Sequence, residues 1–390
     1  MAAGSVRALT LEGTRQLSLR EYPYPAGLPS GAALIRMEFS GICGTDKHSY
    51  KGEIFQYGGR PLPLPVIPGH ENVGVIEALG GEFLDHDGVP LKPGDRVVIA
   101  ANLPCGRCYF CRNGHPYYSC VEKLDYGNNL SARNPPHLFG GWGEILYAAP
   151  GSILFRYPDT LPVELGVLVE PLAVTGCLDK AKSWASDWEP FRPADTVVVL
   201  GVGPIGMCHL VKARFLGAGV LIAVDLSDYR LEMAKRFDAS ETVRGGDDKV
   251  VRERVFGLTH GRGADVVVDC TGVPAGFRLG LDLIREGGLL IEVGAFVDGG
   301  DVPLNPHRDI LAKNARIMGV AGDDLAAYST GIAMMETTLD RFPWQDLISH
   351  RFSLDEHEAA MAAALGPDSM KVVYAPNTVL DPTRRVPPPS

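Results

Sequence analysis

The chain carries two different patterns of apolar and polar residues. About the first 165 residues contain short apolar runs, such as 33–37 and 96–100, separated by turns rich in glycine and proline. That pattern is typical of β-strands. From about residue 162 the pattern becomes helical, and a continuous β-branched run follows at 196–200. A run of this kind is typical of a strand that is buried on both faces of a parallel sheet.

Further strands and helices alternate after this run. Buried strands are predicted at 221–224, 266–269 and 289–293, and helices at 205–215, 228–237 and 275–285. Such alternation predicts a doubly wound parallel sheet, so the fold class is α/β. We expect a β-rich domain from residues 1–170 and 321–390, and a parallel-sheet domain from residues 171–320. The length of 390 residues agrees with two domains.

Composition excludes several classes of partner. The formal net charge of -10 and the absence of a basic stripe disfavour nucleic acid, because phosphates would be repelled. No apolar run approaches the roughly 20 residues that cross a bilayer, and the first 13 residues lack a signal-peptide pattern. The sequence therefore predicts a cytoplasmic protein without a membrane or nucleic-acid partner.

A glycine-rich turn directly follows the apolar run at 196–200. It reads Gly201-Val-Gly203-Pro204-Ile205-Gly206 and opens a predicted helix. In this strand-turn-helix context the first glycine permits a tight turn, the second admits a pyrophosphate close to the backbone, and the third allows helix and strand to pack closely. The turn therefore predicts a dinucleotide site at the start of the helix.

Asp225 ends the next predicted strand, 19 residues after Gly206. A carboxylate at this place can bind both ribose hydroxyls of the adenosine and disfavours a 2′-phosphate. NAD is therefore the expected cofactor. Arg230 could bind the ribose side as well, which leaves NADP open.

Four of the eight cysteines lie within one short segment: Cys105, Cys108, Cys111 and Cys120. In a reducing compartment such crowding favours a metal over disulfides. Four thiolates suit a closed tetrahedral zinc shell, which has a structural rather than a catalytic role. An iron-sulfur cluster and metal-free surface thiols are the alternatives, and the first is disfavoured because no second cysteine set appears.

A second set of metal-ligand types is scattered along the chain. Cys43 and His70, with either Glu71 or Glu170, would give zinc three protein ligands and leave one position open for a substrate oxygen. Asp46 is near enough in sequence to accept a hydrogen bond from the other ring nitrogen of His70 and so to orient the ring.

Together these motifs resemble the zinc-containing medium-chain dehydrogenases, the superfamily of alcohol, polyol and threonine dehydrogenases. The resemblance covers nearly the whole chain. It rests on residues 43–46, 69–71, 94–97 and 201–206, the four-cysteine segment and Glu170-Pro171, all in the family's order. It implies a GroES-like catalytic domain, a Rossmann cofactor domain, and Cys43 and His70 as ligands of a catalytic zinc. The segment between Cys111 and Cys120 has eight residues, one more than is usual in the family.

The resemblance also implies roles for other residues. The position of Glu170 carries cysteine in simple alcohol dehydrogenases but often glutamate in polyol and sugar dehydrogenases, whereas Glu71 approaches or replaces a ligand at some stages. Thr45 resembles the hydroxyl that accepts the substrate proton, and His48 resembles the imidazole that passes it to solvent. Homodimers or homotetramers are implied as well.

We therefore predict a zinc-dependent, NAD-linked oxidoreductase that acts on a small alcohol, with a polyol or sugar favoured. Threonine, or a simple or aromatic alcohol, is the alternative substrate. A non-catalytic sensor or scaffold that binds nucleotide is the alternative from another class, because fold alone does not establish chemistry.

Overall fold

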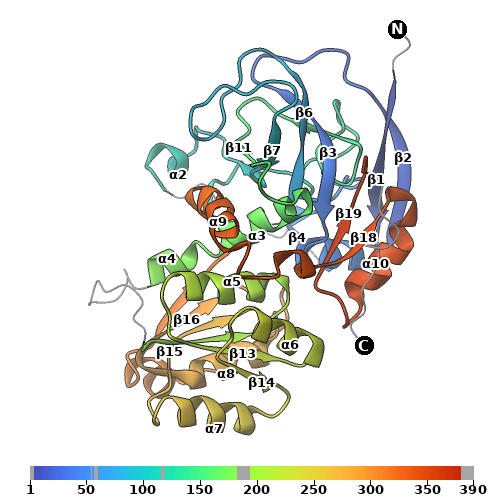
Figure 1. Cartoon of the computed structure of the whole chain (residues 1–390). Coiled ribbons are helices and arrows are strands. Elements are labelled where there is room, and N and C mark those ends of the chain that lie inside the picture. Colours follow the sequence, from blue (N-terminus) through green and yellow to red (C-terminus); the bar gives the residue numbers. More distant parts are fainter. Residues whose placement is uncertain (1–3, 54, 57–59, 116–118, 182–193, 379–390) are drawn as a thin grey trace. The chain divides into compact units, whose positions relative to one another are not determined.

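The computed structural model describes residues 4–53, 55–56, 60–115, 119–181 and 194–378. The chain divides into two compact units (Figure 1). Unit 1 consists of residues 1–173, 324–339 and 344–390, and unit 2 of residues 174–323 and 340–343. The domain boundaries predicted after residues 170 and 320 each lie three residues before those of the units, and the return of 340–343 to unit 2 was not predicted.

Unit 1 is built around a mostly antiparallel sheet with the strand order β11-β7-β6-β3-β19-β18, and β10 pairs with β3. These strands are β3 (Ala33–Gly41), β6 (Asn72–Leu79), β7 (Arg96–Ile99), β10 (Ile145–Ala148), β11 (Leu154–Arg156), β18 (Ile348–Phe352) and β19 (Lys371–Tyr374). Smaller antiparallel pairs are β1 (Ser5–Gly13) with β2 (Gln16–Pro23), β4 (Phe55–Gln56) with β5 (Arg60–Pro61), and β8 (Asn102–Leu103) with β9 (Leu124–Asp125).

The alternating direction of the β3 side chains explains why apolar clusters cover both faces of this sheet. Ala33, Ile35 and Met37 belong to one buried cluster, and Leu34 belongs to another. Because successive side chains of a strand point to opposite faces, the apolar run at 33–37 supplies both cores. The helices of unit 1 are α1 (Gly44–Lys51), α2 (Tyr109–Arg112), α3 (Val169–Val174), α9 (Leu325–Thr338) and α10 (His357–Leu365).

Unit 2 contains a six-stranded parallel sheet in the order β14-β13-β12-β15-β16-β17. Its strands are β12 (Thr196–Leu200), β13 (Val220–Asp225), β14 (Glu241–Arg244), β15 (Ala264–Asp269), β16 (Ile284–Glu292) and β17 (Arg316–Gly319). Its helices are α4 (Cys177–Ala181), α5 (Pro204–Phe215), α6 (Asp228–Arg236), α7 (Asp248–Leu258) and α8 (Pro274–Leu283). The chain runs outward from β12 to β14, returns to the centre and continues from β15 to β17. This order confirms the doubly wound sheet.

One predicted boundary in unit 2 was wrong. The helix predicted at 275–285 ends at Leu283, and the strand predicted from residue 289 already begins at Ile284. Ile284 has an extended backbone and pairs with Ala264, after which the register shifts before Leu289 pairs with Val266. Pairing with a distant strand therefore overrode the helical pattern of the local sequence.

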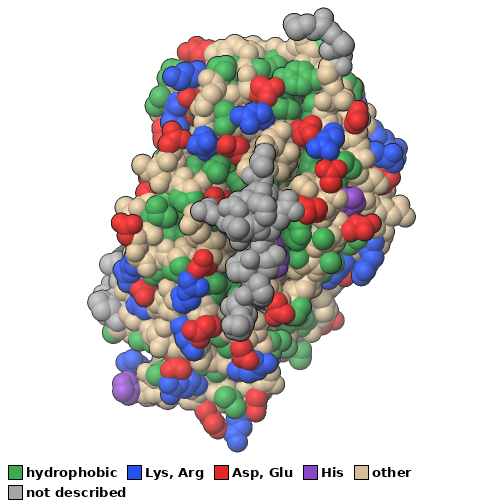
Figure 2. Space-filling model, turned by 45° about the vertical axis from the view of Figure 1, so that its right-hand side comes forward, with side chains coloured by type: hydrophobic (Ala, Val, Ile, Leu, Met, Phe, Trp, Pro, Cys, Tyr) green, Lys and Arg blue, Asp and Glu red, His purple; other side chains and the backbone are tan. Residues whose placement is uncertain are grey.

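Among the described residues, no helix is both long and apolar enough to cross a membrane. On the face shown in Figure 2, basic and acidic side chains are interspersed.

Candidate metal and dinucleotide sites

Cys43 lies where β3 leads into α1. It is the N-cap residue of the helix, and its backbone N–H donates to Asp46 Oδ2 at 2.8 Å, so the Asp46 carboxylate closes a capping box. Thr45, in the first turn, places its Oγ1 3.9 Å from Cys43 Sγ. The helix start therefore brings the thiol, the hydroxyl and the carboxylate of residues 43–46 into one small region.

Asp46 also connects this region to His70. The other carboxylate oxygen accepts a hydrogen bond from the Gly69 N–H at 3.4 Å and lies 4.0 Å from His70 Nδ1. Asp46 and His70 are both buried, and among the described residues His70 Nδ1 has no hydrogen-bond partner. Asp46 therefore lies beside the ring at ion-pair distance, without the hydrogen bond that was predicted between them.

The ring of His70 interacts with a thiol and with carboxylates, the other two predicted types of zinc ligand. Burial alone would lower the pKa of His70, but Asp46, a hydrogen bond with Cys43 and the charge of Glu170 together raise it well above its ordinary value. Thiolate, imidazole and carboxylate are ligands that zinc accepts. Cys43, His70 and Glu170 thus fit a zinc ion in chemistry, and Cys43 and Glu170 both act on His70 electrostatically. Their three ligand atoms do not all lie within 4.8 Å of one another.

Glu71 has a different environment. Its two carboxylate oxygens lie 2.5 and 2.7 Å from Lys371 Nζ, and both side chains are almost completely buried. Gly41 makes room for this pair, because a Cβ atom added there would lie 1.9 Å from Glu71 Oε2. Sequence reasoning missed Lys371, although a lysine in the apolar run Lys371-Val-Val-Tyr374 indicates a buried partner.

His48, which was predicted to pass the substrate proton to solvent, contacts an acid that sequence reasoning also missed. His48 Nδ1 lies 2.7 Å from Glu53 Oε2, and both side chains are partly exposed. The hydrogen bond with His48, followed by the charge of Lys51, lowers the pKa of Glu53. Thr45 and His48 lie three residues apart on α1, the spacing of neighbours on one helix face.

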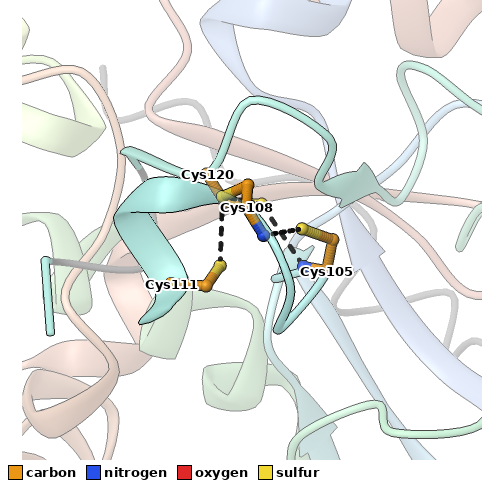
Figure 3. Close-up of side chains that lie close together, drawn as sticks. All are labelled: Cys105, Cys108, Cys111 and Cys120. Atoms are coloured by element: carbon orange, nitrogen blue, oxygen red, sulfur yellow. Dashed lines mark hydrogen bonds between the residues drawn. The ribbon is translucent and has the colours of Figure 1, made fainter. Parts of the chain in front are cut away.

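The four predicted cysteines of the second site converge (Figure 3). Their sulfur atoms all lie within 4.8 Å of one another, and no other group of three or more cysteine, histidine or acidic side chains does so among the described residues. Cys108 Sγ lies 3.5 Å from Cys111 Sγ and 3.9 Å from Cys120 Sγ. A tetrahedron with zinc-sulfur bonds of about 2.3 Å has edges of about 3.8 Å, so the cluster fits zinc.

Backbone amides favour the thiolate form in this cluster. The N–H of Cys105 donates to Cys120 Sγ at 3.3 Å, and the N–H of Cys108 donates to Cys105 Sγ at 3.4 Å. The amide of Cys111 is the largest of the influences that lower the pKa of Cys108 to about 6, whereas burial and hydrogen bonds with Cys108 and Cys120 raise the pKa of Cys111 to about 12. The thiolate is the form that binds a metal.

The glycine turn of unit 2 has the steric demands predicted for it. Gly201 has φ of 80°, which favours glycine, and a Cβ atom on Gly206 would lie 1.9 Å from the Gly201 carbonyl oxygen. Gly203 is the N-cap of α5, Pro204 occupies its first turn, and Ile205 follows. The first N–H groups of α5, those of Ile205 and Gly206, therefore lie within the turn, as a pyrophosphate site requires.

Asp225 ends β13 beside this turn. Its Oδ2 accepts a hydrogen bond from the Val202 N–H at 2.8 Å, and its Oδ1 accepts one from the Ser227 N–H at 2.9 Å. Arg230 Nη1 lies 3.9 Å from Asp225 Oδ2. Asp225, which was predicted to favour NAD, and Arg230, which left NADP open, therefore lie close together.

Comparison with known proteins identifies the family. Residues 29–159 match the alcohol dehydrogenase GroES-like domain, and residues 204–338 match the zinc-binding dehydrogenase domain. A probable alcohol dehydrogenase of Mycobacterium tuberculosis is 32% identical over 369 residues, which cover 93% of this chain and 95% of that protein. A sorbitol dehydrogenase of Bacillus subtilis is 28% identical over 96% of this chain and 98% of its own length.

A solved structure gives the same result. The crystal structure of an alcohol dehydrogenase from Thermotoga maritima aligns with a TM-score of 0.86 and 28% identity, over 96% of this chain and all of that one. The chain belongs to the zinc-binding alcohol and polyol dehydrogenase family. The resemblance noted in the sequence is thereby confirmed, and the protein is an enzyme whose cofactors are zinc and a nicotinamide dinucleotide.

Proposed function

We propose that the protein catalyses the NAD-linked oxidation of a secondary alcohol, with a polyol or sugar favoured, or the reverse reduction. The observation that carries this proposal is that buried His70 interacts with Cys43 and Asp46, at the start of α1, and with Glu170 of α3. When bound there, zinc supplies a Lewis acid that stabilises negative charge on the substrate oxygen.

We infer that Glu170 rather than Glu71 is the third protein ligand. Glu71 is held by Lys371 through both carboxylate oxygens, and releasing it would leave a buried ammonium group without its partner. Glu170 is buried on α3 and acts electrostatically on His70. A glutamate in this role supports a polyol or sugar as the substrate.

Two residues of α1 are proposed to move the substrate proton. Thr45 lies beside Cys43 and would accept the proton from the alcohol through its hydroxyl oxygen while its own proton passes on toward His48. His48, which is partly exposed, would pass the proton to solvent, and Glu53 holds the ring through its Nδ1 atom.

Asp225 supports NAD over NADP. Its carboxylate is anchored by two backbone amides, so it cannot turn away from an approaching 2′-phosphate without losing both hydrogen bonds. Arg230 is close enough to Asp225 to offset part of this charge. We therefore expect a preference for NAD rather than complete exclusion of NADP.

The test is formation of reduced cofactor by zinc-replete protein with a panel of polyols, sugars, threonine, and simple aliphatic and aromatic alcohols, each with NAD and with NADP. We expect turnover of a polyol or sugar with NAD, which chelation or Cys43→Ser abolishes. Cys208→Ala, which changes a buried cysteine of α5, is the control and should keep turnover. Turnover of threonine alone, or of simple alcohols alone, would overturn the proposed substrate class.

The oligomeric state stays a prediction. Within the described sheet of unit 2, β17 pairs only with β16 and is therefore an edge strand. We infer a homodimer or homotetramer, and light scattering that gives a monomer would contradict it.

A further inference from the structure

Two acidic side chains end neighbouring strands of unit 2. β15 and β16 lie side by side in the parallel sheet (Figure 1), and Asp269 is the register partner of Glu292. Register partners on parallel strands point to the same face of the sheet. The last residues of β15 and β16 therefore place two carboxyl groups next to each other, and Asp269 is buried.

Neutral groups surround this carboxyl pair. Asp269 Oδ1 accepts hydrogen bonds from the Thr271 N–H at 2.9 Å and the Thr271 hydroxyl at 2.7 Å. Glu292 Oε1 accepts one from the Ala295 N–H at 2.7 Å. Glu292 Oε2 is buried, and no N–H or O–H group of the described residues donates to it. The described residues form no ion pair with either acid.

The pair is poised to hold a single shared proton near neutral pH. Burial, and next the charge of Asp269, raise the pKa of Glu292 to about 7. Cys270 follows Asp269, and burial raises the pKa of its thiol, as it does for nearby Cys177. These thiols stay neutral over the range in which the carboxyl pair changes its charge, so among the described residues the two acids set the local charge there.

The position of the pair in the sheet indicates which half of a bound dinucleotide lies near it. In a doubly wound sheet the ligand lies outside the carboxyl ends of the strands, where the strand order reverses, and its two halves lie over the two halves of the sheet. Here the order reverses between β12 and β15. Asp225 marks the adenosine half at the end of β13, so the ends of β15 and β16 belong to the nicotinamide half.

The two redox states of the cofactor differ in charge at that half. The nicotinamide ring is cationic in the oxidised dinucleotide and neutral in the reduced one. At an effective dielectric constant of about 20, one additional negative charge within about 10 Å of a cation raises its affinity by about tenfold. When the carboxyl pair loses its shared proton, the affinity of the site should therefore rise for the oxidised cofactor and not for the reduced one.

We propose that the Asp269–Glu292 carboxyl pair makes the site prefer the oxidised dinucleotide over the reduced one, and that this preference grows when the pair gives up its shared proton. The inference rests on the proposed function, because it requires unit 2 to bind a nicotinamide dinucleotide. By linkage, binding of the oxidised cofactor promotes release of the proton.

The test measures the dissociation constants of NAD+ and NADH from about pH 5.5 to about 8.5, by calorimetry on the wild-type protein and two variants. Glu292→Gln removes the titrating group. Glu286→Gln removes a carboxylate from an exposed position on the same strand and is the matched control. In wild type and control, the dissociation constant of NADH divided by that of NAD+ should rise about tenfold with pH. In Glu292→Gln this ratio should rise by less than about twofold.

The outcomes separate the two proposals. If both cofactors bind but the ratio is independent of pH, or rises equally in Glu292→Gln, the inference is overturned and the proposed function stands. If neither cofactor binds the wild-type protein, the proposed function falls and the inference with it. If Glu292→Gln does not fold, the pKa of Glu292 can be measured from its carboxyl resonance in wild-type protein without cofactor. A pKa near the ordinary glutamate value would overturn the inference that the pair shares a proton.

Discussion

Lys371 and Glu71 form a buried ion pair in which the lysine Nζ atom lies within 2.7 Å of both carboxylate oxygens. The two residues are 300 positions apart in the sequence, and the pair joins β19 to the residue next to His70. Breaking a buried pair is costly because one charge is left without compensation. Lys371 therefore engages both carboxylate oxygens of Glu71, and loss of the lysine would leave a buried carboxylate unpaired.

Replacing Lys371 by methionine should lower the free energy of unfolding of unit 1 by about 3–5 kcal/mol, because Glu71 is left buried and unpaired. Urea denaturation measures this loss, and adding Glu71→Gln should restore most of it. Lys235→Met provides the contrast. Lys235 binds Glu232 at 2.9 Å on the surface, and its loss should cost less than about 1 kcal/mol. Equal losses in the two single variants would contradict the assigned role.

Metal analysis separates the two candidate carboxylate ligands. Glu170→Ala should reduce the bound zinc from about two ions per chain to about one, because only Cys43 and His70 would remain as ligands of the catalytic ion. Glu71→Gln should keep both ions. Cys120→Ser should remove the other ion while leaving the catalytic one. Loss of zinc from Glu71→Gln, with retention in Glu170→Ala, would reverse the assignment.

Cofactor selection should depend on the charge of Asp225. Asp225→Asn keeps a side-chain oxygen for one backbone amide but removes the repulsion of a 2′-phosphate. We expect kcat/KM with NADP, relative to NAD, to rise about tenfold or more. Asp228→Asn removes a far more exposed carboxylate three residues later and should leave the ratio nearly unchanged. A ratio that does not move in Asp225→Asn would show that other residues select the cofactor.

The raised pKa of Glu292 predicts how stability depends on pH. In the unfolded chain Glu292 loses its proton near its ordinary pKa of 4.5, whereas in the folded protein it keeps it until about 7. The folded state then binds more protons between these values, so stability falls as pH rises through this window and levels off above it. Since Glu292 is only partly buried, the loss should be about 1–2 kcal/mol.

Glu292→Gln should remove this part of the pH dependence, and thermal unfolding without cofactor at about pH 5 and about pH 8 measures it. Glu286→Gln should behave like the wild type. An unchanged slope in Glu292→Gln would mean that Glu292 titrates in the folded protein as it does in the unfolded chain.

Several site features could be predicted because they depend on residues close together in sequence. Cys105, Cys108, Cys111 and Cys120 span 16 positions, and their sulfur atoms converge in the structure. The turn from Gly201 to Gly206 follows a buried strand and opens a helix, as its glycines indicated. In such segments the backbone conformation of a few residues is enough to place the functional groups.

Other features depend on partners that no local pattern specifies. Glu53 was missed because it lies beyond the motif that indicated His48, although only five positions separate the two residues. Lys371 could be suspected of having a buried partner, but its identity follows from where β19 lies beside β3. Asp269 and Glu292 meet only because β15 and β16 pair in one register, and a shift by one residue would send one side chain to the opposite face.

By itself, the sequence determined the α/β class, the dinucleotide turn and the ligand types available for zinc, because periodicity and short spacings act through neighbouring residues. Only the tertiary structure decided that Glu71 binds Lys371, that His70 interacts with both Cys43 and Asp46, and that Asp269 faces Glu292. The charge of a buried group is set by its nearest partners, and strand register and packing bring those partners from distant parts of the chain.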